Sequence, residues 1–207
     1  MVPKVVALAL FWGVAVCAQD AIYFERDFPG AVPGRFEVRL EADGSATYTE
    51  DGEEPAEFNI GQADADTVFG WAEGLQRFSK PLASSRRVAS TGRKKLRFES
   101  GGRIVGEAEF DYSEVKKARE VTSWFVGLAE TRQHLRELER ALRFDPLGVN
   151  DALVKATDAM ERDRLSAPQL LESVLSEISA QKRLLHLARA RADGLLERIR
   201  AKRSSGR

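Results

Sequence analysis

GEAEFDYSEVKKAREVTSWFVGL, residues 106–128, contains the change of hydrophobic period that decides the fold. Up to Tyr112, apolar and charged side chains alternate, which is typical of a half-buried strand. From Ser113 onward the apolar residues follow a helical spacing. The chain therefore divides into a strand-rich part before Ser113 and a helical part after it.

The alternating pattern predicts a hairpin that ends at Tyr112. Residues 95–99 alternate in the same way, and Gly101-Gly102-Arg103 supplies the turn. Opposite charges that face each other across the strands favour one register. That register sets Phe98 opposite Gly106, Arg97 opposite Glu107, Leu96 opposite Ala108 and Lys95 opposite Glu109. We expect Gly106 to leave room for the ring of Phe98, and the charged pairs to lie on the open face.

A second hairpin is predicted upstream, over residues 35–48. A three-residue loop at 42–44 pairs Leu40 with Ala46 and Val38 with Tyr48, which keeps the apolar side chains on one face. Tyr23, Phe24 and Phe28 indicate a further strand, and residues 51–57 and 79–86 are typical of loops. Between the hairpins one helix is predicted on the apolar face of the sheet, from the spacing of Val68, Trp71, Ala72, Leu75 and Phe78.

After Ser113, which we expect to cap the first helix, apolar residues recur every seven positions at Val121, Leu128, Leu135 and Leu142. Pro146-Leu-Gly148 ends that helix, and Asn150 is expected to cap a short helix through Met160. Ser166 is expected to cap the last and longest helix, with Pro168 in its first turn. Its heptad residues are Leu171, Ile178, Leu185, Ala192 and Ile199.

The predicted fold class is α+β: a small antiparallel sheet with one packed helix, followed by a long-helix hairpin or small helical bundle. Two long helices side by side, with the short helix filling a gap, are the expected arrangement. The predicted boundaries are a cleavable signal peptide at 1–18, a strand-rich α+β part at 19–112, a helical part at 113–203 and a disordered tail at 204–207.

The N-terminal residues match the pattern of an export signal. Lys4 precedes an apolar run at 5–16, and Val16-Cys17-Ala18 offers small residues for cleavage before Gln19. The run spans roughly 18 Å as a helix, short of the ~30 Å of a bilayer core, so we expect cleavage rather than anchoring. We therefore expect a periplasmic or extracellular protein without disulfides, since Cys17 is removed with the signal. A lipid on Cys17 is the alternative, and only it would add a membrane partner.

Charge is balanced overall but distributed unevenly. The chain has 32 basic and 32 acidic residues, yet nine carboxylates and no Lys or Arg lie between Glu41 and Asp66. Nine Lys and Arg residues lie from Lys182 to the end. The two segments could meet within one chain or between chains, or serve only as solvated surfaces.

No catalytic, cofactor or metal site is predicted. Ser113-Glu-Val-Lys116 matches the Ser-x-x-Lys of serine β-lactamases, but the partner motifs are missing and capping explains Ser113. His134 and His186, the only histidines, belong to no ligand pair and are expected on helix surfaces. Asp64 and Asp66, and the acidic loop 50–54, lack the spacing of a dedicated calcium site. The basic C-terminal segment suits a helix end, and no nucleic-acid partner is expected.

Two short motifs support a resemblance. At Phe28-Pro-Gly-Ala-Val-Pro33 and Phe144-Asp-Pro-Leu-Gly-Val-Asn150 the chain resembles a group of uncharacterised secreted bacterial proteins. The resemblance implies a small strand-rich part followed by long helices, and it implies no activity for any residue.

These observations favour a non-enzymatic binding or structural role, with another protein as the partner. Trp124 and Phe125 are adjacent, so about 100° of helix arc separates them and both cannot face one interface. If the sheet covers one, the other is a possible partner contact; if the chain covers both, neither is. The alternative function is a secreted or periplasmic hydrolase, with Ser113 and the acidic loop as the first residues to test. The sequence predicts neither the oligomeric state nor the identity of the partner.

Overall fold

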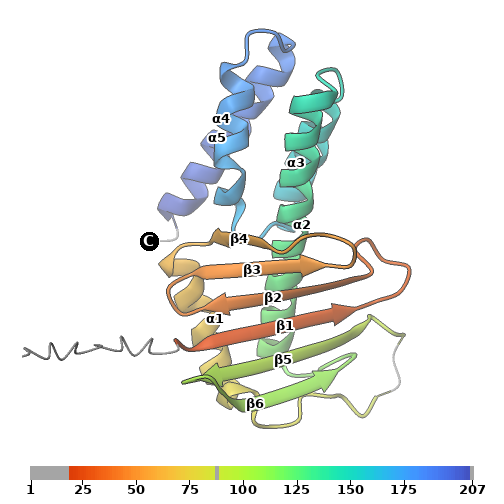
Figure 1. The fold of residues 1–207 in the computed structure, drawn as a ribbon, viewed down its shortest axis with the longest axis vertical. Helices are drawn as coiled ribbons and strands as arrows, with labels where there is room; N and C mark the ends of the chain where they lie inside the picture. The colour runs from red at the N-terminus through yellow and green to blue at the C-terminus, as the bar shows by residue number, and fades with distance from the viewer. Residues whose placement is uncertain (1–18, 87–88, 206–207) are drawn as a thin grey trace, which may run out of the picture.

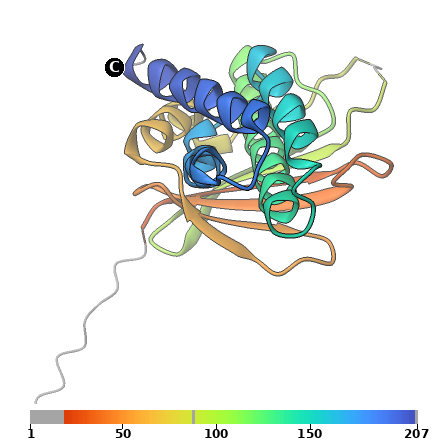
Figure 2. The same ribbon diagram turned by 90° about the horizontal axis from the view of Figure 1, so that it is seen from above.

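A computed structural model describes residues 19–86 and 89–205 of the protein. A six-stranded antiparallel sheet forms one end of the molecule, and a group of helices projects beyond its β4 edge (Figure 1). Seen from above, the helices lie on one side of the sheet (Figure 2). The α+β fold class is therefore confirmed, whereas the predicted signal peptide lies outside the described residues.

The strands are β1 (Ala21–Asp27), β2 (Arg35–Glu41), β3 (Ser45–Glu50), β4 (Ala56–Asn59), β5 (Arg93–Ser100) and β6 (Arg103–Phe110). The α-helices are α1 (Gln62–Gly74), α2 (Lys116–Phe144), α3 (Val149–Glu161), α4 (Glu172–Ala180) and α5 (His186–Ser205). Two short 3₁₀ segments complete the fold, η1 (Gln76–Phe78) and η2 (Pro168–Leu171).

The sheet has the order β4-β3-β2-β1-β5-β6, and both predicted hairpin registers are confirmed. The strand expected near Tyr23 and Phe24 is β1, which lies at the centre between β2 and β5. Phe28 is not part of it, because its N–H donates to the Gly34 carbonyl (2.7 Å) in the turn that follows. The loop predicted at 51–57 is too long, since Ala56 already pairs with Tyr48.

Helix α1 covers the apolar face of the sheet as predicted, with Ala65, Val68 and Ala72 buried. It ends at Gly74, and η1 follows with positive φ angles. The backbone of η1 packs onto β6 at Gly106, where an added Cβ would lie 2.0 Å from the Arg77 carbonyl oxygen. The small residue opposite Phe98 therefore admits the backbone of η1.

The open face of the second hairpin carries ion pairs in a slightly different arrangement from the predicted one. Arg97 contacts Glu107 at 2.9 Å as expected, and hydrogen bonding from Arg97 holds the pKa of Glu107 below its usual value. Lys95 also contacts Glu107, at 3.1 Å, although its cross-strand partner is Glu109. Glu109 instead lies 3.7 Å from Arg93.

In the helical part, α2 ends before Pro146 as predicted. The predicted cap at Asn150 is wrong: α3 begins one residue earlier, at Val149, and the Asn150 side chain accepts a hydrogen bond from Arg191 of α5. The last helix is also not continuous, because it is interrupted at residues 181–185. Ser166 therefore caps no long helix, and Pro168 opens the short η2 segment.

The interruption lets α4 and α5 fold back on each other and bury one heptad stripe from two antiparallel helices. Leu171, Ile178, Ala192 and Ile199 are buried, whereas Leu185 lies in the turn and is 54% exposed. A continuous helix could not have packed its two halves together. The prediction of a continuous last helix beside α2 is therefore wrong, and the predicted alternative, a small helical bundle, is the arrangement that forms.

Two hydrophobic clusters share α2. Its first half, with Val121, Phe125 and Leu128, belongs to the cluster under the sheet. Its second half, with Leu138 and Leu142, belongs to the cluster of the helical bundle. The predicted boundary at Ser113 thus marks the change of hydrophobic period, whereas the division between the two clusters falls within α2.

Of the tail predicted at 204–207, residues 206–207 lie outside the described residues, and residues 204–205 are helical, because α5 continues through Ser205. Its basic residues pair within the bundle: Arg198 with Glu161 (2.6 Å), Lys202 with Asp163 (2.5 Å) and Arg203 with Glu172 (3.2 Å). The acidic segment pairs elsewhere, with Glu50 at 2.6 Å from Arg136 of α2. These basic residues of α5 therefore do not pair with the acidic segment.

Candidate functional site

Phe125 and Trp124 point to different surroundings. Phe125 is fully buried and stacks on Phe24 of β1, with ring centroids 4.8 Å apart and planes 8° from parallel. It is therefore part of the core and unavailable to a partner. Trp124 is partly buried, and its ring meets that of Phe125 edge-on at 5.2 Å.

Trp124 lines an open cavity of about 670 Å³ together with Trp71 of α1 and Ser166 of the α3–η2 connection. That connection crosses α2 at Gly127, where an added Cβ would lie 2.7 Å from the Arg164 carbonyl oxygen. The hydroxyl of Thr131 donates to the Ser166 carbonyl (2.7 Å) and holds the crossing in place. The surface around Trp124 is thus a hollow bounded by the chain itself, not a free helix face.

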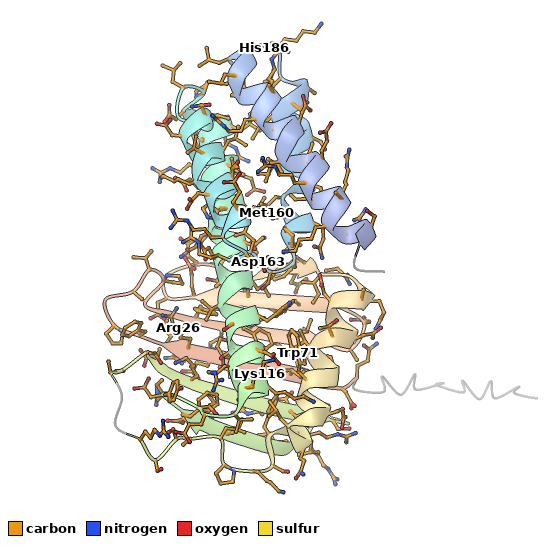
Figure 3. All side chains as sticks on the ribbon, turned by 180° about the vertical axis from the view of Figure 1, so that it is seen from behind. Arg26, Trp71, Lys116, Met160, Asp163 and His186 are labelled. Carbon is orange, nitrogen blue, oxygen red and sulfur yellow. The ribbon has the colours of Figure 1, made fainter. Side chains whose placement is uncertain are left out.

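A second surface lies at the far end of the bundle from the sheet, where the α2–α3 turn and the α4–α5 turn meet. We call it the distal end. Its large apolar side chains are unusually exposed: Phe144 (73%), Leu147 (77%), Leu185 (54%) and Leu187 (57%). Figure 3 shows His186, which begins α5, at this extremity of the molecule.

Local hydrogen bonds fix the two turns of the distal end. Asp145 follows α2, and its carboxylate accepts the N–H of Gly148 at 3.0 Å, which closes the α2–α3 turn. The guanidinium of Arg183 donates to the Leu142 carbonyl (3.2 Å) and joins the α4–α5 turn to the end of α2. The exposed apolar residues are therefore presented on a connected framework.

A polar notch of about 380 Å³ adjoins these turns. It is lined by charges of both signs, Glu139 and Glu177 against Arg143 and Arg183. The distal end thus combines exposed apolar side chains with a mixed-charge recess. That combination suits recognition of a protein surface, in which apolar contacts are surrounded by polar ones.

The residues considered for catalysis are not arranged for it. Ser113 is 1% exposed, and its Oγ accepts the N–H of Val115 at 3.2 Å. It does not cap α2 as predicted, since the helix begins at Lys116 and Val115 occupies the capping position. The amine of Lys116 lies 3.5 Å from Glu120. The Ser-x-x-Lys motif therefore forms no accessible nucleophile and base.

The two histidines lie apart, on α2 and at the start of α5. His134 is more buried than expected, with 12% of its side chain exposed, and burial lowers the pKa of its imidazole. His186 is exposed, as predicted. Within residues 19–86 and 89–205, no group of three His, Cys, Asp or Glu side chains is placed to hold a metal ion.

The carboxylates considered for calcium have structural contacts. Asp64 accepts a hydrogen bond from Gln169 at 2.6 Å, and Asp66 accepts one from Gln62 at 2.7 Å. Glu53 of the acidic loop lies 3.7 Å from Arg136. The contacts of Asp64 and Glu53 tie α1 and the β3–β4 loop to the helical part.

Sequence reasoning missed the distal end. Phe144 and Leu147 flank a Pro-containing turn, and apolar residues at such a turn were a usable signal. Leu185 and Leu187 gave no signal, because a continuous heptad predicted the first to be buried. No helix in the described part of the chain is both long and apolar enough to cross a membrane. Comparisons with models of protein families, with curated proteins and with solved structures find no match to this chain.

Proposed function

We propose that the protein is a non-enzymatic binding protein that acts outside the cytoplasm, and that its distal end contacts another protein. One observation carries this proposal: four large apolar side chains, each more than half exposed, lie in or directly beside the two joined turns. Large apolar patches at the surface of a monomer are characteristic of interaction sites.

The charges of the distal end favour a protein over a lipid bilayer. Arg143 and Arg183 alone would suit an anionic membrane, but Glu139 and Glu177 line the same notch. Carboxylates at that position would be repelled by anionic headgroups, whereas a protein can present charges of both signs. Arginine is also enriched in protein interfaces, since its planar group makes several directed hydrogen bonds.

Trp124 is a second candidate contact, on a separate surface. It lies in the cavity over α2 and is only partly exposed. In protein interfaces, a side chain of the partner often enters such a hollow and packs against the aromatic residue. Because the α3–η2 connection already occupies part of this surface, the distal end is the stronger assignment.

Site-specific photo-crosslinking in the producing cell tests the assignment. A photoreactive amino acid at Leu147 should give a discrete protein adduct in the exported fraction. The matched control replaces Arg103, an exposed residue at the β5–β6 turn, and should give none. A third variant carries the probe at Trp124.

The outcomes separate the alternatives. An adduct from Leu147 alone supports the distal end. An adduct from Trp124 alone would move the contact to the cavity over α2, and labelled lipid from Leu147 would replace the protein partner by a membrane. Hydrolysis of a peptide, glycan or ester library by the purified protein would overturn the non-enzymatic role.

A further inference from the structure

A cavity of about 780 Å³ opens on the flank of α2 away from α1. Figure 3 shows Arg26 of β1 on this flank and Trp71 of α1 on the opposite one. Apolar side chains from three elements line it: Val32 of the β1–β2 turn, Val126 of α2 and Val154 of α3. Charged and polar side chains complete the lining, and a cavity of this size is typical of small-molecule sites.

Arg26 is the unusual group of this cavity. Among the described residues its guanidinium has no ion pair and no hydrogen bond, and it packs over the Phe28 ring at 5.2 Å. Its direct cross-strand partner is Lys94, so two cations lie side by side on the helix-covered face of the sheet. Like charges at this position are destabilising, and burial lowers the pKa of Arg26.

Lys94 is satisfied by the chain, whereas Arg26 is not. The Lys94 ammonium donates to the carbonyls of Gly92 at 2.7 Å and Asp111 at 2.6 Å. No comparable acceptor among the described residues faces Arg26. The guanidinium is therefore a strong donor left open at the cavity wall.

The carboxylates of the cavity are already neutralised. Glu130 and Asp158 each lie 3.1 Å from the guanidinium of Arg164. Asp158 also contacts Arg162 at 2.9 Å. Neither carboxylate pairs with Arg26, so an anion from outside the chain would meet an unopposed positive charge.

We propose that this cavity binds an amphiphilic organic anion, whose carboxylate or phosphate head pairs with Arg26 and whose apolar body lies along Val126 and Val154. A guanidinium binds either head through two parallel hydrogen bonds. The apolar body would cover Val32 and Val154, which are 88% and 44% exposed. The ligand therefore supplies both the missing anion and the missing apolar cover.

Isothermal titration of the purified protein tests this site with four probes that each carry a ten-carbon chain, below their micelle concentrations: decanoate, decyl phosphate, decanol and decyltrimethylammonium. At least one of the two anions should bind, and the stronger one identifies the head group. The alcohol and the cation should bind at least about tenfold more weakly, since a hydrogen bond to a charged group contributes roughly 1.5–3 kcal/mol. Equal binding of the anions and the cation would overturn the proposal.

Three variants locate the site. Arg26→Gln should weaken anion binding at least about tenfold. Arg140→Gln, at an exposed position of α2 outside the cavity, should bind like the wild type. Val154→Glu places a carboxylate on the cavity wall at an exposed helix position, so it should also weaken binding even if Arg26→Gln fails to fold. Wild-type affinity in both Arg26→Gln and Val154→Glu would contradict the assignment.

Discussion

At His134 the fold holds an imidazole among charges of both signs. Glu130 and Glu137 lie 3.9 and 4.0 Å away, while Arg164 and Lys155 oppose protonation. Burial outweighs the two carboxylates and lowers the pKa of His134 below its ordinary value of 6.5. The neutral form is therefore the one that the folded state favours.

This residue should make stability depend on pH. Because the folded state binds the proton less well than the unfolded state, His134 contributes stability that is present above about pH 6.5 and lost as the pH falls. His134→Gln should reduce the loss of unfolding free energy between pH 7 and pH 5, measured by urea denaturation. The control His186→Gln should keep the wild-type dependence, and an unchanged slope in His134→Gln would contradict this account.

The packing of η1 on the sheet depends on a single glycine of β6, Gly106. The sequence predicted the register at Gly106 correctly, because alternation and cross-strand charge are local. It did not predict what lies above Gly106, since the contact joins residues 76–79 to β6 through tertiary packing. Local patterns therefore specified the pairing of strands, and the role of the glycine required the fold.

Two glycine substitutions test this contact. Gly106→Ala places a methyl group 2.0 Å from the Arg77 carbonyl oxygen, so it should destabilise the protein by about 1–3 kcal/mol or more. Gly70→Ala, in α1 with nothing within 4 Å, should be neutral or stabilise by up to about 1 kcal/mol. Thermal and urea unfolding of both variants decide the matter, and equal effects would contradict the packing of η1 on β6.

The packing of α4 against α5 buries the heptad stripe. The sequence predicted this stripe correctly but assigned it to a single helix. Periodicity alone does not show a break when the stripe continues in register beyond it, as it does from Ile178 to Ala192. The apolar period therefore predicted the buried residues, except Leu185, and failed on the connection.

Paired substitutions in α4 test the stripe. Ile178→Asp buries an unpaired charge in the helical cluster and should cost more than about 3 kcal/mol. Glu177→Lys changes an exposed neighbour and should alter stability by at most about 0.5 kcal/mol. Similar melting temperatures for the two variants, measured by circular dichroism, would show that the stripe is not buried.

For the whole molecule, α2 is the element that connects sheet and bundle. Its first half packs against β1 through Phe125, and its second half supports the distal end through Leu138 and Leu142. The sequence predicted this helix and its apolar face well. The distal end and the Arg26 cavity escaped prediction, because each combines residues from separate elements whose placement no local pattern encodes.

The central claim is that the distal end serves recognition and not stability. The double variant Leu147→Glu/Leu185→Glu changes side chains that are 77% and 54% exposed. It should therefore change the free energy of unfolding by less than about 1 kcal/mol. The deciding measurement is the yield of the crosslinked complex from the producing cell, with the photoreactive residue at Leu187 in both proteins. We predict loss of the complex in a fully folded double variant; an undiminished complex would contradict the claim.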